Sequence, residues 1–178
     1  MRIISGQARG LKLIAPEGLA TRPTTDRVKE SMFNIISTRL PAQNVLDLFA
    51  GSGALGLEAL SRGSKHCVFV EKDRAALAVL NQNLERSRQA QKAEVFAGDG
   101  FTYLCRTSQK FDIIFLDPPY NQGLLTRAVR EIAENDLLLP QGIVVCEGEV
   151  GGEAPKDEHF NILKSAKYGK TMVYILGR

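Results

Sequence analysis

The alternation of short apolar runs with amphipathic stretches constrains the fold of this chain more than any other feature. After Pro41, apolar runs of four or five residues recur at 45–49, 67–70, 94–97, 113–116 and 143–146. The stretches between them have helical periodicity, as in residues 75–84, where Leu77, Leu80 and Leu84 fall on one face. Strands that alternate with helices are typical of a parallel, doubly wound sheet, so the sequence predicts an α/β fold.

The last part of the chain departs from this alternation. Residues 160–163 and 172–176 have the pattern of two strands, and the connection between them, 164–171, has no room for a helix. We therefore expect the last strand to be antiparallel. The connection is basic, and two alternatives stay open for it: contact with RNA, or a solvated hairpin loop.

The first forty residues contain a separate set of patterns. Two short alternating runs within residues 1–21 predict a small β-hairpin with Arg9 near its tip. Residues 22–40 form a basic segment and a helix, in which four apolar residues make one stripe: Val28, Met32, Ile35 and Ile36. Thr24, Thr25 or Asp26 supplies the N-cap of this helix. Arg22 and Arg27 flank it, either as a phosphate site or as solvated arginines.

The composition is that of an ordinary globular protein. With 178 residues, 44% hydrophobic and 24% charged, the chain predicts one domain spanning 1–178 and no membrane-spanning segment. Cys67, Cys105 and Cys146 are widely spaced and show no metal-ligand pattern. We expect reduced core thiols, no metal, and a cytoplasmic protein without a secretory segment.

Positive charge is concentrated at the front of the chain. Residues 1–40 hold seven Lys/Arg against three Asp/Glu, a net charge of 7 − 3 = +4, whereas the rest of the chain has 16 − 17 = −1. A basic front on a near-neutral body indicates an anionic partner that docks there, with a solvated basic face as the alternative. The seven are Arg2, Arg9, Lys12, Arg22, Arg27, Lys29 and Arg39.

A glycine-rich loop follows the first predicted strand. The segment Gly51-Ser52-Gly53-Ala54-Leu55-Gly56 has the G-x-G-x-x-G pattern of a nucleotide site, between a strand and a helix. Glu71 lies eighteen residues beyond Gly53, where an acid would bind ribose. Nucleotide-type binding is therefore favoured over a structural glycine turn.

Two further acids indicate which nucleotide. Asp47 precedes the glycines and would repel a pyrophosphate but attract the ammonium of an amino acid, which S-adenosylmethionine (AdoMet) contains. Asp99 ends the third predicted strand, where it would bind the adenine, or alternatively cap the next helix. AdoMet is therefore the predicted cofactor.

The segment Asp117-Pro118-Pro119-Tyr120 follows the fourth predicted strand. Two prolines fix the backbone and donate no N–H, so this segment presents acceptors in a stiff frame. With the carboxylate of Asp117 and the flat face of Tyr120, it suits a planar group that carries an amine. A proline-rich turn is the structural alternative.

Together these motifs resemble the AdoMet-dependent amino-methyltransferases. Within them, the chain resembles the RsmD group, which methylates the N2 amine of a guanine in bacterial 16S rRNA. The front segments that carry this resemblance are Arg2-Ile3-Ile4-Ser5-Gly6 through Arg9-Gly10, and Arg22-Pro23-Thr24-Thr25-Asp26-Arg27-Val28-Lys29-Glu30. The resemblance covers nearly the whole chain and is weakest over 150–166. It implies a Rossmann-like methyltransferase fold with a seven-stranded, mostly parallel sheet.

The resemblance also implies roles for individual residues. Asp117 and the Pro118 carbonyl would hold the target amine, and Tyr120 would stack on a flipped base. The implied cofactor residues are Asp47, Phe49, Ala50, Gly51, Ser52, Gly53, Glu71, Lys72, Asp99 and Gly100. The implied RNA-binding residues are Arg2, Arg9, Lys12, Arg22, Thr24, Thr25, Arg27 and Pro119.

Other functions share some of these features. A DNA adenine-N6 or cytosine-N4 methyltransferase would share the cofactor site and the Asp117 segment, although the chain has no separate recognition domain. A dehydrogenase would share the glycines but would leave Asp47 and the Asp117 segment unexplained. A non-catalytic RNA-binding module would keep the basic front segment and would need neither Asp47 nor the Asp117 segment. The expected partner is 16S rRNA, free or within the 30S subunit or an assembly intermediate, bound by a monomer.

Overall fold

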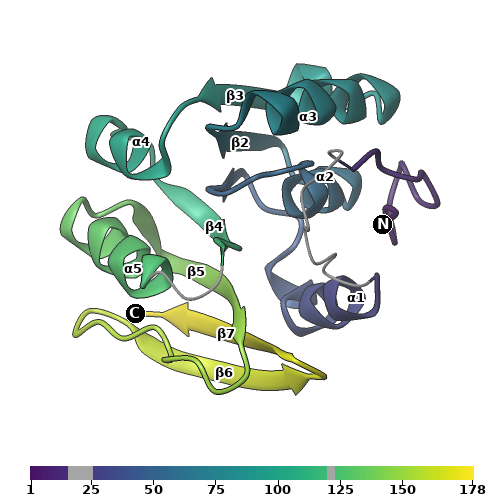
Figure 1. Ribbon diagram of the computed structural model, residues 1–178. Helices are drawn as coiled ribbons and strands as arrows, with labels where there is room; N and C mark the ends of the chain where they lie inside the picture. Colours follow the sequence, from purple (N-terminus) through teal and green to yellow (C-terminus); the bar gives the residue numbers. More distant parts are fainter. Residues whose placement is uncertain (16–25, 120–122) are drawn as a thin grey trace.

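A computed structural model describes residues 1–15, 26–119 and 123–178 of the chain (Figure 1). They form one seven-stranded sheet with the strand order β3-β2-β1-β4-β5-β7-β6. The strands are β1 (Asn44–Asp47), β2 (His66–Glu71), β3 (Ala93–Ala97), β4 (Phe111–Leu116), β5 (Leu138–Glu149), β6 (Asn161–Tyr168) and β7 (Thr171–Gly177).

The first five strands are parallel, and β7 lies antiparallel between β5 and β6. This confirms the predicted mostly parallel sheet with an antiparallel last strand. Except for Asp112, buried apolar residues make up β4, which pairs with β1 on one side and with β5 on the other. Central strands covered on both faces need such continuous apolar runs.

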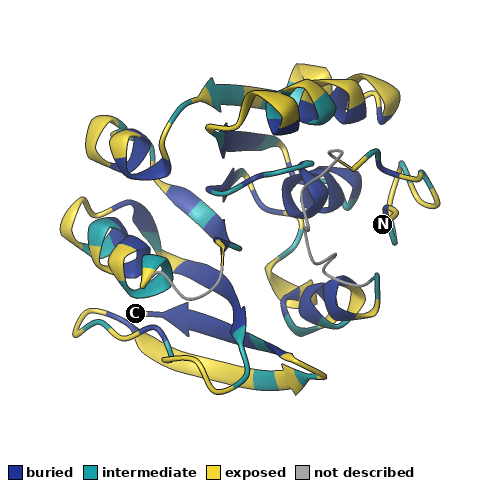
Figure 2. Ribbon diagram, viewed as in Figure 1, coloured by how far each residue is buried: buried dark blue, intermediate teal, exposed yellow. Residues whose placement is uncertain are grey.

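Helices cover both faces of the sheet (Figure 1). Residues of α1, α2 and α3 belong to one apolar cluster, and residues of α4 and α5 belong to the other. Figure 2 shows that the central strands are buried, whereas α1, α3, α4 and α5 each have exposed residues. The helices are α1 (Asp26–Ile35), α2 (Ala54–Ser61), α3 (Arg74–Arg86), α4 (Gly100–Arg106) and α5 (Leu124–Glu134), with short 3-10 turns at Ser37–Arg39 and Ala90–Lys92. In the part of the chain that the structure describes, none of them is long and apolar enough to span a membrane.

Helix α2 is buried along its whole length because the N-terminal segment, residues 1–15, covers it. The described part of the predicted hairpin is short: Arg2 and Lys12 form an antiparallel bridge, and the Ile3 N–H donates a hydrogen bond of 2.9 Å to the Leu11 carbonyl. Side chains of the body also hold this segment in place. Glu58, for example, accepts hydrogen bonds from the backbone N–H groups of Ile4 and Ser5.

Two other predictions from the sequence need correction. The predicted loop 164–171 is mostly strand, because β6 continues to Tyr168 and only Gly169 and Lys170 form the turn. The sequence did not predict this part of the strand because β6 is an edge strand that is exposed over most of its length. Its residues are mostly polar and show no apolar alternation. Cys105 is an exposed residue rather than a core thiol, whereas Cys67 and Cys146 are buried.

Candidate active site

The predicted site residues follow the carboxyl ends of neighbouring parallel strands. Asp47 ends β1, Glu71 ends β2, and Asp117 directly follows β4. The strand order reverses between β1 and β4, which places the glycine loop and Asp117 on either side of the switch point. Ligands of open α/β sheets bind at this kind of crevice.

The glycine loop that connects β1 to α2 has a conformation that requires glycine. Gly51 and Gly53 have φ values of +53° and +81°. A Cβ on Gly53 would lie 2.4 Å from Cδ1 of Leu80, so the loop also packs directly against α3. A hydrogen bond of 2.7 Å from the Gly53 N–H to the Ala50 carbonyl closes the turn. The G-x-G pattern therefore reflects both backbone conformation and close packing.

Asp47 is a buried carboxylate beside this loop. It is 1% exposed, and its Oδ2 accepts a hydrogen bond of 2.9 Å from the Gly56 N–H. Burial raises the pKa of Asp47 to about 7, and the nearby Glu71 carboxylate adds to the increase, against the Gly56 hydrogen bond. A ligand cation at this position would favour the ionised form, so Asp47 fits the ammonium of an amino-acid moiety.

Glu71 braces the glycine loop. Its Oε2 accepts a hydrogen bond of 2.8 Å from the Gly51 N–H, and its Oε1 accepts two from the Lys72 and Asp73 N–H groups, also at 2.8 Å. The sequence pattern indicated the ribose role of Glu71 but not this bracing. The exposed side chain of Lys72 lies at the same turn.

Asp99 is the N-cap of α4, the alternative that the sequence left open. Its Oδ1 accepts a hydrogen bond of 3.0 Å from the Thr102 N–H and lies 3.3 Å from the Thr102 hydroxyl. The adenine role stays a prediction. The next residue packs closely on the loop after β1, because a Cβ on Gly100 would lie 3.3 Å from Cε1 of Phe49.

The segment after β4 is stiff where the structure describes it. Asp117 is partly buried, Pro118 is buried and Pro119 is exposed. Tyr120, the predicted stacking residue, lies outside the described residues. The arrangement brings a carboxylate and two proline carbonyls to the edge that also carries Asp47 and the glycine loop.

The chain is similar to a described protein family, to curated relatives and to solved structures. The family described as conserved hypothetical protein 95 matches residues 1–177. YlbH from Bacillus subtilis is 40% identical over 98% of this chain and 97% of its own length. Ribosomal RNA small subunit methyltransferase D from Escherichia coli is 39% identical over 87% of this chain and 78% of its own length. The solved structure of yhhF from Escherichia coli is 37% identical, covers 100% of this chain and 97% of its own, and has a TM-score of 0.88.

This chain belongs to the RsmD family. The resemblance predicted from the sequence is thereby confirmed, and the seven-stranded sheet is the Rossmann-like fold of methyltransferases.

The predicted RNA-binding residues of this family member are only partly described. Arg9, Lys12 and Arg27 are exposed. Arg2 forms an ion pair of 3.2 Å with Asp26, so part of its charge is already balanced. Three residues lie outside the described part of the chain: Arg22, Thr24 and Thr25.

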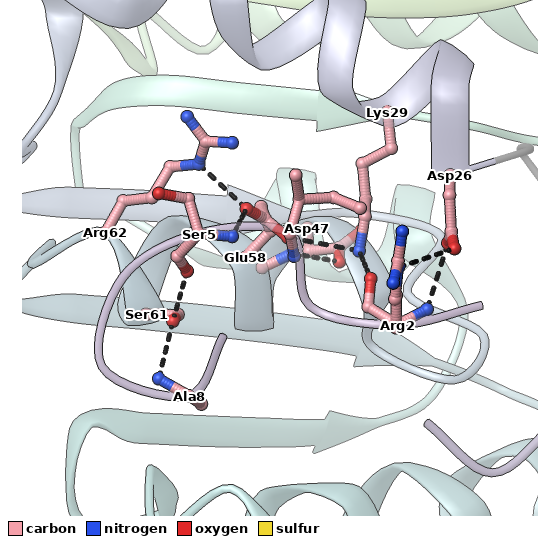
Figure 3. A network of polar contacts seen from close by, with 11 residues as sticks. Arg2, Ser5, Ala8, Asp26, Lys29, Asp47, Glu58, Ser61 and Arg62 are labelled. Carbon is pink, nitrogen blue, oxygen red and sulfur yellow. Dashed lines mark hydrogen bonds and ion pairs between the residues drawn. The ribbon is translucent and has the colours of Figure 1, made fainter. Parts of the chain in front are cut away.

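Lys29 does not belong to the basic face, which corrects the charge count made from the sequence. Its side chain is fully buried, lies 3.1 Å from Oε2 of Glu58, and donates a hydrogen bond of 2.6 Å to the Arg2 carbonyl (Figure 3). Burial lowers the pKa of Lys29 more than the Glu58 carboxylate raises it. The lysine therefore fastens the N-terminal segment to α1 instead of contacting an external partner.

Glu58 is the centre of this buried network in α2 (Figure 3). Besides Lys29 it binds Nε of Arg62 at 2.8 Å and the backbone N–H groups of Ile4 and Ser5 at 2.7 and 3.1 Å. A buried carboxylate is stable only when it is paired and fully hydrogen-bonded in this way. Sequence reasoning missed Glu58, although it is the one charged residue of the otherwise apolar α2.

Proposed function

We propose that this chain transfers a methyl group from AdoMet to the exocyclic N2 amine of a guanine in small-subunit (16S) rRNA. The observation that carries the proposal is the convergence of Asp47, the glycine loop and Asp117 at one sheet edge of an RsmD-family chain. The RsmD-family relative from Escherichia coli is named as a methyltransferase of small-subunit ribosomal RNA.

The residues at the edge fit AdoMet. Asp47 would bind the ammonium of its methionine part, beside the backbone of the loop from Phe49 to Gly53. Glu71 would bind the ribose: its three hydrogen bonds to the loop and turn leave an acceptor site on Oε2 for a hydroxyl. Asp99 would receive the adenine amine, with Lys72 and Gly100 at the rim. When bound, AdoMet supplies a methyl group on a positively charged sulfur.

The segment after β4 would position the attacking nitrogen. The lone pair of an aromatic amine is delocalised into its ring, so the amine is a poor nucleophile. The carboxylate of Asp117 and the Pro118 carbonyl would accept hydrogen bonds from the two N–H groups of the amine and direct its lone pair at the methyl group. The nitrogen would form the new bond to the methyl carbon while the carbon–sulfur bond breaks with its electrons going to sulfur, and the proton that the nitrogen loses would pass to the Asp117 carboxylate and then to water. Orientation of this kind contributes roughly 7–11 kcal/mol.

The target base must leave the RNA stack to reach this edge, at a cost of a few kcal/mol. Stacking on Tyr120 would offset about 1–3 kcal/mol of that cost. Pro119 lies next to it on the exposed surface. Arg9, Lys12 and Arg27, with Arg2, Arg22, Thr24 and Thr25, would bind phosphates and fix the register. We propose that residues 1–178 act as one domain and as a monomer on cytoplasmic rRNA, free or in 30S particles.

Replacement of Asp117 tests the proposal. Asp117→Ala should abolish transfer of labelled methyl from AdoMet to small-subunit rRNA or 30S particles. Binding of the product S-adenosylhomocysteine (SAH) should stay within a few-fold of wild type, because Asp117 acts on the amine. Near wild-type turnover would contradict the mechanism. Label in DNA instead of RNA, or at a position other than guanine N2, would redirect the proposal to another substrate.

A further inference from the structure

Asn83 links the N-terminal segment to the glycine loop. It lies on α3, is fully buried, and its amide makes three hydrogen bonds. Its Oδ1 accepts from the Ile14 N–H at 2.9 Å, and its Nδ2 donates to the carbonyls of Ile14 and Ser52, both at 3.0 Å. Both amide hydrogens are therefore used.

The contact with Ile14 replaces a strand partner. One primary amide binds both the N–H and the carbonyl of the same residue, as a neighbouring strand would in an antiparallel pair. Ile14 lies between two groups of predicted RNA-binding residues, one that ends at Lys12 and one that begins at Arg22. The position of the segment at this point thus depends on the orientation of one side chain.

The contact with Ser52 reaches the predicted cofactor site. Ser52 lies between Gly51 and Gly53, whose positive φ values set the direction in which its carbonyl points. A rotation of the Ser52 peptide would break the bond to Asn83 and leave a buried amide hydrogen unpaired. An unpaired buried donor is unfavourable, so this hydrogen bond opposes the rotation. The loop and the N-terminal segment therefore share one hydrogen-bonded amide.

We propose that Asn83 is a positioning residue that couples RNA docking on the N-terminal segment to cofactor binding in the glycine loop. The proposal rests on the function proposed above. Occupancy of the loop holds the Ser52 carbonyl in place, which holds the Asn83 amide and with it Ile14. Coupling between two sites is reciprocal, so bound RNA must tighten cofactor binding by the same factor.

A thermodynamic cycle on two asparagines of α3 tests the coupling. The affinity for SAH is measured with and without small-subunit rRNA or 30S particles, for wild type, Asn83→Ala and Asn81→Ala. Asn81 is exposed and serves as the matched control. RNA should tighten SAH binding by about fivefold or more in wild type and in the control, within the usual range of coupling. In Asn83→Ala the ratio should fall below about twofold while each ligand still binds.

A wild-type ratio of one, or an unchanged ratio in Asn83→Ala, would overturn the coupling. A merely structural asparagine would lower the melting temperature and leave the ratio intact. If Asn83→Ala does not fold, hydrogen exchange in wild type decides: SAH should slow exchange of the Ile14 amide several-fold, and no slowing contradicts the proposal. The hydrogen-exchange measurement needs no RNA. Its outcome is therefore independent of the methylation assay with rRNA, which tests the proposed function.

Discussion

Asp47→Asn should make the protein more stable at neutral pH and weaken cofactor binding. In the folded protein, burial holds the pKa of Asp47 at about 7, compared with 3.8 for an ordinary aspartate. Asparagine is neutral and keeps an oxygen that can accept the hydrogen bond from the Gly56 N–H. The substitution therefore removes a buried charge and little else from the protein without ligand.

The magnitude follows from the two pKa values. Between pH 3.8 and about 7 the folded state binds a proton at Asp47 that the unfolded state has released, so this group's contribution to the unfolding free energy falls as pH rises. The fall is about 1.4 kcal/mol per pH unit, or roughly 3 kcal/mol from about pH 5 to pH 8. Asp47→Asn lacks this decrease.

Urea unfolding at about pH 5 and pH 8 measures the difference. Relative to wild type, Asp47→Asn should gain about 3 kcal/mol between the two pH values. Asp73→Asn is the matched control, because Asp73 is exposed and caps α3 with a hydrogen bond to the Ala76 N–H that asparagine also makes. An equal pH dependence of the unfolding free energy in Asp47→Asn and in wild type would refute the raised pKa of a buried Asp47 carboxylate.

The same variant should lose affinity for SAH. Removal of one partner of a buried charge pair costs about 2–3 kcal/mol, equivalent to a 30- to 150-fold loss. In wild type, SAH affinity should fall as pH drops below about 7, because protonation of Asp47 competes with the ligand ammonium. Titration calorimetry with SAH measures both effects. Unchanged SAH affinity in Asp47→Asn would contradict the ammonium contact.

Two further predictions concern the N-terminal segment. Arg9→Gln with Lys12→Gln should weaken rRNA binding and lower the slope of log affinity against log salt by about 0.7–0.9 per lost phosphate contact; an unchanged slope in filter-binding titrations would exclude phosphate contacts there. Lys29→Met should destabilise the fold by about 3 kcal/mol, since it leaves the buried Glu58 with one cation fewer. Thermal unfolding should show a decrease of about 6–12 °C, and a decrease below about 2 °C would contradict the role of the buried pair.

Much of the fold was predictable from the sequence because its signals are local. The predicted run 113–116 lies within β4, and the predicted helix 75–84 lies within α3. The spacing of apolar residues and the positions of glycines indicate helices, strands and turns within short stretches of the chain. Strand β6 was predicted only at its beginning, over 160–163, because the rest of this exposed edge strand shows no apolar alternation.

The candidate site was predictable to a similar degree. Asp47 and Asp117 were placed at strand ends from the runs that precede them, and the structure brings those ends to one edge. The bracing of the loop by Glu71 was not predicted, and the cap made by Asp99 was predicted only as the alternative to adenine binding. A carboxylate at a strand end has the same sequence signature whether it binds a ligand, a loop amide or a helix N-terminus.

The sequence by itself determined the order of strands and helices, the glycine loop and the acids that follow the strands, because these depend on residues adjacent in the chain. Only the tertiary structure decided that Lys29 is buried and that Asn83 joins two sites. The Asn83 and Ile14 partners are 69 residues apart, and the Glu58 and Ile4 partners are 54 apart. No local pattern states which distant polar groups will meet, because that depends on how the N-terminal segment packs over α2 once the sheet has formed.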